Sequence, residues 1–181
     1  MRISTKKIVL TALMIALVFL ITYLPFLHLP SPIPPGYFNI GDAAVMIAAI
    51  LLGRRVGFAA GAIGSAVADL VYAAFFFAPI TFIVKGVEGY VVGVIANSKS
   101  EKVPVSVKRI VALIIGALLM PAGYFFFEIT VYRLLFDKTL AVAAIISELP
   151  GNLLQGAVSA VVAYVFVALL DKTKIFKNLN Q

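Results

Sequence analysis

Several residue types are missing from this chain, and each absence removes a class of chemistry. Its 181 residues include no cysteine, no tryptophan and a single histidine, His28. Without cysteine there is no disulfide and no thiol nucleophile, and one histidine cannot build a metal cluster alone. We therefore predict no catalytic thiol and no metal site. Tyrosine and phenylalanine must take the interfacial positions that tryptophan often holds in membrane proteins.

Charge is scarce as well, which decides the class of protein. Only 13% of the residues are charged and 62% are hydrophobic, and the mean hydropathy is +1.08. A soluble domain of this size could not hide so much apolar surface. We predict one integral membrane domain over residues 1–181. The net charge of +7 is interpreted as a basic excess in cytoplasmic loops, with no nucleic-acid partner.

The N-terminal segment looks like a signal peptide but is too long for one. Arg2, Lys6 and Lys7 precede an uncharged run over 8–27, about 20 residues and enough to span a bilayer. A signal peptide has an apolar core of about 7–15 residues. No small-residue cleavage site precedes Pro30, so we interpret the run as a retained first helix.

The apolar runs predict an all-α membrane fold of six transmembrane helices. They lie at about 8–27, 40–53, 56–75, 79–97, 110–134 and 140–170, the last broken at Pro150-Gly151. With six spans, twelve of the fifteen Lys and Arg residues fall on the side of the N-terminus. The positive-inside rule then places both termini in the cytoplasm. We expect the multi-pass protein in a prokaryotic cell membrane.

A proline-rich loop joins the first two predicted helices. Residues 28–37 include Pro30, Pro32, Pro34 and Pro35, which lack the backbone donor that helices and sheet ladders need. We predict a stiff, extended, extracellular loop that forms neither and that caps a ligand cavity.

Ionisable residues within the apolar runs predict that cavity. Lys85, Glu88, Glu128 and Glu148 lie in or beside these runs, and each charge placed in hydrocarbon costs roughly 2.5–3.5 kcal/mol. Lys85 and Glu88 are three residues apart and share a helical face. They form either a private ion pair or part of a ligand site. Asp69 is expected to hydrogen-bond a neighbouring helix instead.

Polar and aromatic side chains near these charges complete the candidate site. Pro150 and Gly151 interrupt the helical pattern beside Asn152 and Gln155, which share one face. Such a wall suits a heterocycle with ring nitrogens and carbonyls, although a proline kink with polar side chains bonded to other helices is the alternative. Tyr124 and Tyr132 flank Glu128 on one stripe and could stack on a flat ring. Asn39 and Asp42 fit a helix cap and dipole complement, and Asn39 could also face the cavity.

Small residues recur at helical spacing and predict close helix packing. Gly57, Gly61 and Ser65 form one stripe, and Gly89 and Gly93 form another; both are expected inside the bundle. Ala12 and Ala16 form a third stripe that could instead face a partner. The sequence has no phosphate-binding glycine–lysine loop, so a binding subunit that borrows its energy fits better than an enzyme.

Five blocks of the sequence carry a resemblance to a known family. They are FNIGDA at 38–43, GRRVG at 53–57, GAIGSAVADL at 61–70, KGVEG at 85–89 and ELPGNLLQ at 148–155. Together they resemble the substrate-binding S component of energy-coupling factor (ECF) transporters, in the subgroup grouped with riboflavin S components.

The resemblance implies high-affinity capture of a water-soluble vitamin from outside, beneath the first loop. It also implies assembly with a membrane coupling subunit, the T component, and two cytoplasmic ATPase subunits. Ala12 and Ala16 match the family's alanine-x-x-x-alanine motif, which docks the coupling subunit. The vitamin is cargo, and no cofactor is expected.

The leading prediction is therefore a riboflavin-binding S component, not an enzyme. The predicted substrate-binding residues are Asn39, Lys85, Glu88, Tyr124, Glu128, Tyr132, Glu148, Asn152 and Gln155. Pyridoxine or a thiamine precursor is the alternative cargo. The alternatives in class are a solo proton-coupled carrier that uses Glu128 or Glu148, a membrane enzyme, and a scaffold protein.

Overall fold

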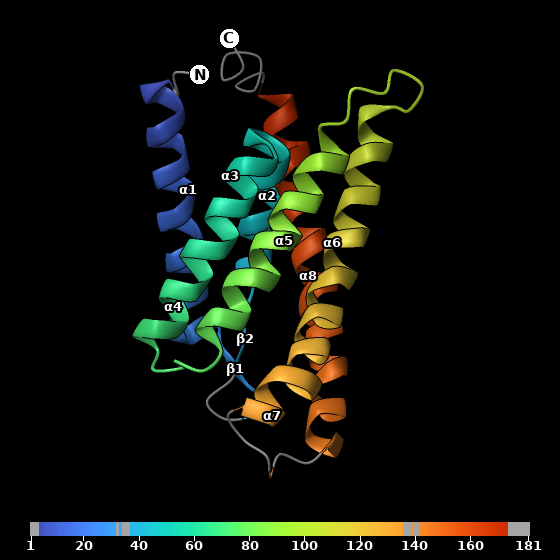
Figure 1. Ribbon diagram of the computed structural model, residues 1–181. Helices are drawn as coiled ribbons and strands as arrows, with labels where there is room; N and C mark the ends of the chain where they lie inside the picture. Colours follow the sequence, from blue (N-terminus) through green and yellow to red (C-terminus); the bar gives the residue numbers. More distant parts are fainter. Residues whose placement is uncertain (1–3, 32, 34–36, 136–138, 140–141, 174–181) are drawn as a thin grey trace.

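Helices account for nearly all of the regular structure. The computed structural model describes residues 4–31, 33, 37–135, 139 and 142–173. Its helical elements are α1 (Thr5–Tyr23), η1 (Pro25–Leu27), α2 (Gly41–Leu52), α3 (Arg54–Ala59), η2 (Ala60–Gly64), α4 (Ser65–Val71), α5 (Ala78–Ala96), α6 (Val105–Phe127), η3 (Glu128–Tyr132), α7 (Arg133–Leu135) and α8 (Val142–Lys172). Because α3, η2 and α4 run on without a break, as do α6, η3 and α7, the bundle has six main helical segments (Figure 1).

These segments confirm the predicted all-α membrane class. Four stretches are long and apolar enough to cross a bilayer, namely 5–23, 78–96, 105–131 and 142–172. The predicted short second span is α2, whose 12 residues cover only about 18 Å. Many large apolar side chains on the outside of the bundle are exposed, as a lipid environment requires.

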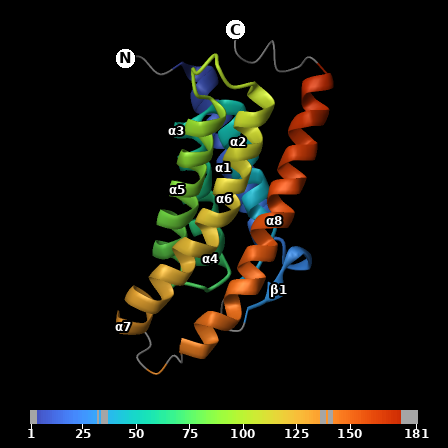
Figure 2. The same cartoon turned by 90° about the vertical axis from the view of Figure 1, so that its right-hand side faces the viewer.

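α2 is the central helix, which explains how it can be so short. It contacts α1, α3, α5 and α8, and every residue from Gly41 to Ile50 is buried. Figure 2, a view at right angles to Figure 1, shows α2 among the longer helices. A short helix enclosed by protein leaves room within the membrane depth for a polar site at its end.

The predicted glycine stripes pack inside the bundle. A Cβ atom on Gly57 would lie 2.5 Å from the backbone oxygen of Gly89, and one on Gly61 would collide with the backbone of Lys85. The backbones of the third and fourth long segments therefore touch, which only small residues permit. This contact sets the position of Lys85 on α5. In contrast, Ala12 and Ala16 are exposed on α1.

Two predictions about local structure are wrong. The proline-rich loop does form a ladder: β1 (Leu29–Pro30) pairs antiparallel with β2 (Tyr37–Phe38), with Leu29 opposite Phe38. A two-stranded ribbon has only edge strands, where proline is tolerated. The last helix is not broken either, because α8 continues through Pro150 for 31 residues; packing against α2 and α6 holds it together despite the missing donor.

The bundle has two distinct ends. α1 begins, α2 turns into α3, α5 leads into α6 and α8 ends at one of them (Figure 1). We call this the basic end, because its described cations are Lys6, Lys7, Arg54, Arg55, Lys99, Lys102, Lys108, Arg109 and Lys172. The ribbon of β1 and β2 lies at the opposite end with α7, which we call the hairpin end.

Candidate functional site

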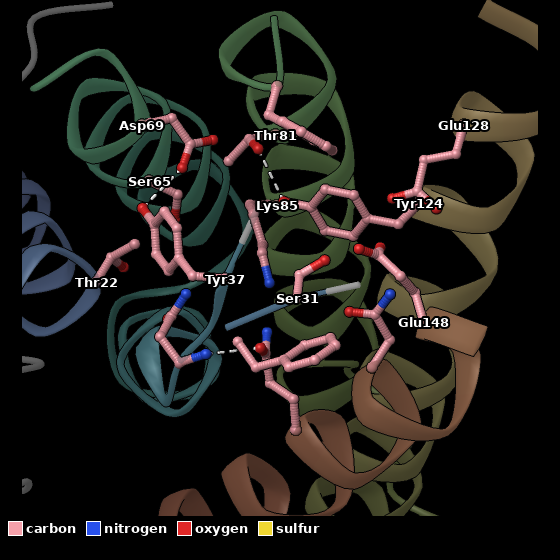
Figure 3. Close-up of a pocket in the computed structure, with 15 residues that line it drawn as sticks. Thr22, Ser31, Tyr37, Ser65, Asp69, Thr81, Lys85, Tyr124, Glu128 and Glu148 are labelled. Atoms are coloured by element: carbon pink, nitrogen blue, oxygen red, sulfur yellow. Dashed lines mark hydrogen bonds between the residues drawn. The ribbon is translucent and has the colours of Figure 1, made fainter. Parts of the chain in front are cut away.

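A polar pocket lies at the hairpin end, enclosed by helices and by the β1–β2 hairpin (Figure 3). Its lining residues come from six parts of the fold and are mostly polar or aromatic. They are Thr22, Ser31, Tyr37, Phe38, Asn39, Ser65, Asp69, Phe77, Thr81, Lys85, Tyr124, Glu128, Glu148, Asn152 and Gln155. Seven of the nine predicted substrate-binding residues are among them.

Of the other two predicted residues, Glu88 is not among the described lining residues, and the position of the Tyr132 side chain is not described. Glu88 lies one turn along α5 from Lys85, is fully buried, and has no hydrogen-bond partner for either carboxyl oxygen among the described residues. Tyr132 ends η3, but its side chain lies outside the described part of the chain. The alternative of a private ion pair between Lys85 and Glu88 is not found among the described residues, because Lys85 pairs with Asp42.

Lys85 pairs with Asp42, a residue that the sequence had assigned only to the helix dipole. The Lys85 Nζ donates to Asp42 Oδ1, and both side chains are buried. Gln155 Nε2 donates to the other oxygen of Asp42 over 2.6 Å. Lys85 also lies 5.4 Å from the centre of the Tyr124 ring, a cation–π distance. This network joins α2, α5, α6 and α8 at the floor of the pocket.

The same network reaches the hairpin through Gln155 and Asn39. The backbone N–H of Asn39 donates to Gln155 Oε1 over 2.8 Å. The Asn39 side chain accepts from the backbone N–H of Gly41 over 2.6 Å, so it caps the start of α2 from one residue before the N-cap, Ile40. Two of the predicted binding residues thus have part of their hydrogen-bonding capacity occupied within the protein.

Glu128 and Glu148 form the acidic wall. Figure 3 shows the two carboxyl groups pointing toward each other, Glu128 from η3 and Glu148 from α8. Glu148 Oε1 accepts the backbone N–H of Ile33 over 3.1 Å. Glu128 Oε2 is buried without a partner among the described residues. A buried polar atom of this kind costs free energy unless it finds a partner, and Glu128 Oε2 belongs to a residue that lines the pocket.

Asn152 and Tyr124 add an amide and an aromatic ring to the lining of the pocket. Asn152 is nearly buried and makes no hydrogen bond to another described residue, which leaves its amide free to donate and to accept. The Tyr124 hydroxyl is held by Thr81 over 2.8 Å. The Tyr124 ring and the Asn152 amide line the same pocket.

The hairpin is fastened over the pocket by a third contact. The Tyr37 hydroxyl donates to Asp69 Oδ1 over 2.8 Å, and its ring stacks on His28 with ring centres 4.1 Å apart. Burial, with the Asp69 carboxyl group beside it, raises the pKa of the Tyr37 hydroxyl above its ordinary value. Tyr37 therefore stays protonated and keeps donating at physiological pH. The sequence predicted an interhelical hydrogen bond for Asp69 and did not place it at the pocket.

The pocket is small in this arrangement. Its volume is about 40 Å³, whereas sites for small organic ligands enclose about 300–1,000 Å³. The hairpin closes the pocket in this arrangement, because Phe38 packs directly on Gly151 of α8 and three hydrogen bonds hold the hairpin to Asp69, Glu148 and Gln155. A ligand of vitamin size requires those contacts to rearrange.

The fold and the site together define a class: a multi-helix membrane protein with an enclosed polar pocket at one end. The chain matches the ECF-type riboflavin transporter S component family over residues 2–172 and belongs to that family, which consists of transporter components and not of enzymes.

One relative has a partial match to this chain. It is an uncharacterized protein from Pyrococcus woesei, 34% identical over 98 residues, a stretch that covers 54% of this chain and 62% of that protein. The chain therefore matches less than two thirds of that relative's length.

Proposed function

We propose that the chain is the substrate-binding subunit of an ECF-type importer and that riboflavin is its ligand. The observation that carries this proposal is a pair of polar groups that line one pocket: Glu128 Oε2, which is buried without a partner among the described residues, and the nearly buried Asn152 amide, which makes no hydrogen bond to another described residue. Riboflavin is the substrate named for the family.

The chemistry of the pocket complements riboflavin group by group. The ring system has carbonyl acceptors next to an N–H donor, which a carboxamide such as Asn152 can satisfy on both counts. The hydroxyl-bearing chain can donate to the carboxyl groups of Glu128 and Glu148. Lys85 would donate to a ring acceptor, while Tyr124 would pack against the ring.

The distribution of charge supports capture from outside the cell. Nine of the eleven described Lys and Arg residues lie at the basic end, which the positive-inside rule assigns to the cytoplasm together with both termini. The pocket lies at the opposite end, beneath the hairpin. A ligand would then enter from outside when the hairpin moves.

Energy for release would come from other subunits. We propose that the T component docks on the exposed Ala12–Ala16 face of α1, because small residues let a partner helix approach closely. Two cytoplasmic ATPase subunits would then drive transport.

Calorimetric titration of the purified chain with a panel of vitamins tests the proposal. We expect submicromolar binding of riboflavin, and a loss of at least tenfold for Asn152→Leu. Ser147→Ala is the matched control, because Ser147 is an exposed polar residue on the same helix whose hydroxyl bonds only its own helix. Binding weaker than micromolar for every vitamin would refute the assignment, whereas tight binding of pyridoxine or a thiamine precursor alone would replace riboflavin.

The facing carboxyl groups of Glu128 and Glu148 support a second candidate, a proton-coupled carrier that works alone. Two carboxyl groups in contact readily share one proton. Uptake into vesicles that contain only this chain, driven by a pH gradient and lost in Glu128→Gln, would favour that candidate. Uptake that requires the partner subunits and ATP would eliminate it.

A further inference from the structure

A second cavity lies at the basic end, on the far side of the bundle from the pocket. Its volume is about 540 Å³, and its lining residues are Lys7, Leu52, Gly53, Arg54, Arg55, Gly93, Val94, Asn97, Ser98 and Lys99. Four of these described residues are cations from three separate segments, and none is a carboxylate. The resulting field attracts an anion.

The four cations are available for such a ligand. All four are exposed, and none forms an ion pair with an acid in the described ranges. By contrast, Arg109 at the same end is paired with Asp171. The cavity thus keeps its positive charge uncompensated.

The walls of the cavity are held by hydrogen bonds. Asn97 Nδ2 donates to the backbone oxygens of Ala49 and Gly93, each over 3.1 Å. Lys108 Nζ donates to the backbone oxygen of Ser98 over 2.9 Å. Because these bonds tie the end of α5 to α2 and to α6, the cavity is a built feature of the bundle.

An apolar groove continues from this cavity along the outside of the bundle. It is lined by Arg55, Phe58, Val87 and Tyr90 and measures about 430 Å³. Arg55 belongs to both lining sets, and the Arg54 guanidinium lies 5.7 Å from the centre of the Tyr90 ring. The basic cavity and an apolar groove between α3 and α5 therefore adjoin at Arg55.

We propose that this composite surface binds one anionic phospholipid, with its phosphate headgroup among Lys7, Arg54, Arg55 and Lys99 and an acyl chain in the groove. A free phosphate would use only the basic cavity, whereas a lipid uses both parts. Basic pockets between transmembrane helices are suited to anionic headgroups. The site is separate from the polar pocket, so the proposal does not depend on the identity of the vitamin.

Native mass spectrometry of the full chain, titrated with phosphatidylglycerol or phosphatidylcholine, tests the headgroup part. Each cation near an anionic headgroup contributes roughly fivefold in affinity, so Arg54→Gln/Arg55→Gln/Lys99→Gln should bind phosphatidylglycerol at least about tenfold more weakly. The matched control is Lys6→Gln/Lys102→Gln/Lys172→Gln, which removes the same charge from the same end outside the cavity and should stay within about twofold. An equal loss in both variants, or no preference for phosphatidylglycerol, would overturn the proposal.

A second pair of variants tests the groove and separates a lipid from a soluble phosphate. Val87→Gln should weaken phosphatidylglycerol binding several-fold, whereas Ile83→Gln should not, because Ile83 is exposed on the same helix outside the groove. If glycerol phosphate displaces the lipid at equal concentration, or if Val87→Gln has no effect, the site binds a free phosphate ester and the lipid assignment is wrong.

Discussion

Asp42 shows how a single side chain can organise a buried site. It is fully buried at the start of the central helix, and its two oxygens accept from Lys85 and from Gln155. The sequence predicted Lys85 and Gln155 at the pocket but assigned Asp42 to the helix dipole. The helix-dipole assignment needed only the position of Asp42 in the sequence. Its partner Lys85 lies 43 positions away, so the sequence alone did not indicate the pair. Only the packing of α2 against α5 reveals the pair.

Removing the charge of Asp42 should destabilise the protein strongly. Asp42→Asn leaves the buried Lys85 cation uncompensated, and breaking a buried pair from one side costs about 3–5 kcal/mol. Asp171→Asn, which breaks the partly exposed pair with Arg109, should cost about 0–1 kcal/mol. Thermal unfolding of both variants in detergent measures the difference, and equal unfolding temperatures would contradict the network. Adding Lys85→Met to Asp42→Asn should recover stability.

The two unsatisfied glutamates should differ in their effect on ligand binding. Glu128 lines the pocket, and a hydrogen bond to a charged group contributes about 1.5–3 kcal/mol, so Glu128→Gln should weaken riboflavin binding by about tenfold or more. Glu88→Gln should change it by less than about threefold, since Glu88 is buried outside the lining. Titration of both variants decides, and the reverse order would restore Glu88 as a contact residue.

Among the elements, the β1–β2 hairpin is the one that covers the pocket. It contacts the rest of the protein through hydrogen bonds to side chains and through Phe38 on Gly151. Proline content predicted a cap over the cavity, and the described loop residues Ser31, Tyr37 and Phe38 do line the pocket. The proline content could not predict the pairing of β1 with β2, because that pairing depends on how α1 and α2 position the two ends of the loop.

Two glycines of α8 make different contacts, one with the hairpin and one with a neighbouring helix. A methyl group on Gly151 collides with the Phe38 ring, whereas one on Gly156 collides with the backbone oxygen of Ala117 on α6. Gly151→Ala should therefore speed riboflavin dissociation several-fold with little change in unfolding temperature. Gly156→Ala should mainly lower the unfolding temperature, since overpacking costs about 1–3 kcal/mol. Identical behaviour in the two variants would show that the hairpin does not control access.

Across the whole molecule, the cations of the basic end and the polar pocket lie at opposite ends. The hydropathy pattern predicted the six segments to within a few residues, because every span is set by a long apolar run. The convergence of Lys85, Glu128 and Glu148 was also predicted, since isolated charges in such runs need a shared polar site. The rotation of each helix was not predictable in this way. It decides that Thr81 and Asp69 face the pocket while Glu88 does not.

The absence of cysteine makes the orientation directly testable. Single cysteines at Ser100→Cys and Thr139→Cys lie at exposed positions near the basic and hairpin ends. A membrane-impermeant maleimide applied to intact cells should label the cysteine introduced at 139 and should label the one at 100 only after permeabilisation. Labelling of position 100 alone would invert the orientation, and with it the direction of capture.

The most direct test of the central claim is an equilibrium titration of the purified chain with riboflavin, followed by quenching of flavin fluorescence. If the pocket beneath the hairpin is the ligand site, quenching will saturate at one riboflavin per chain with submicromolar affinity. Asn152→Leu will shift the curve by at least tenfold, and Ser147→Ala will not. Quenching that fails to saturate at micromolar riboflavin, or that is unchanged in Asn152→Leu, would contradict the account.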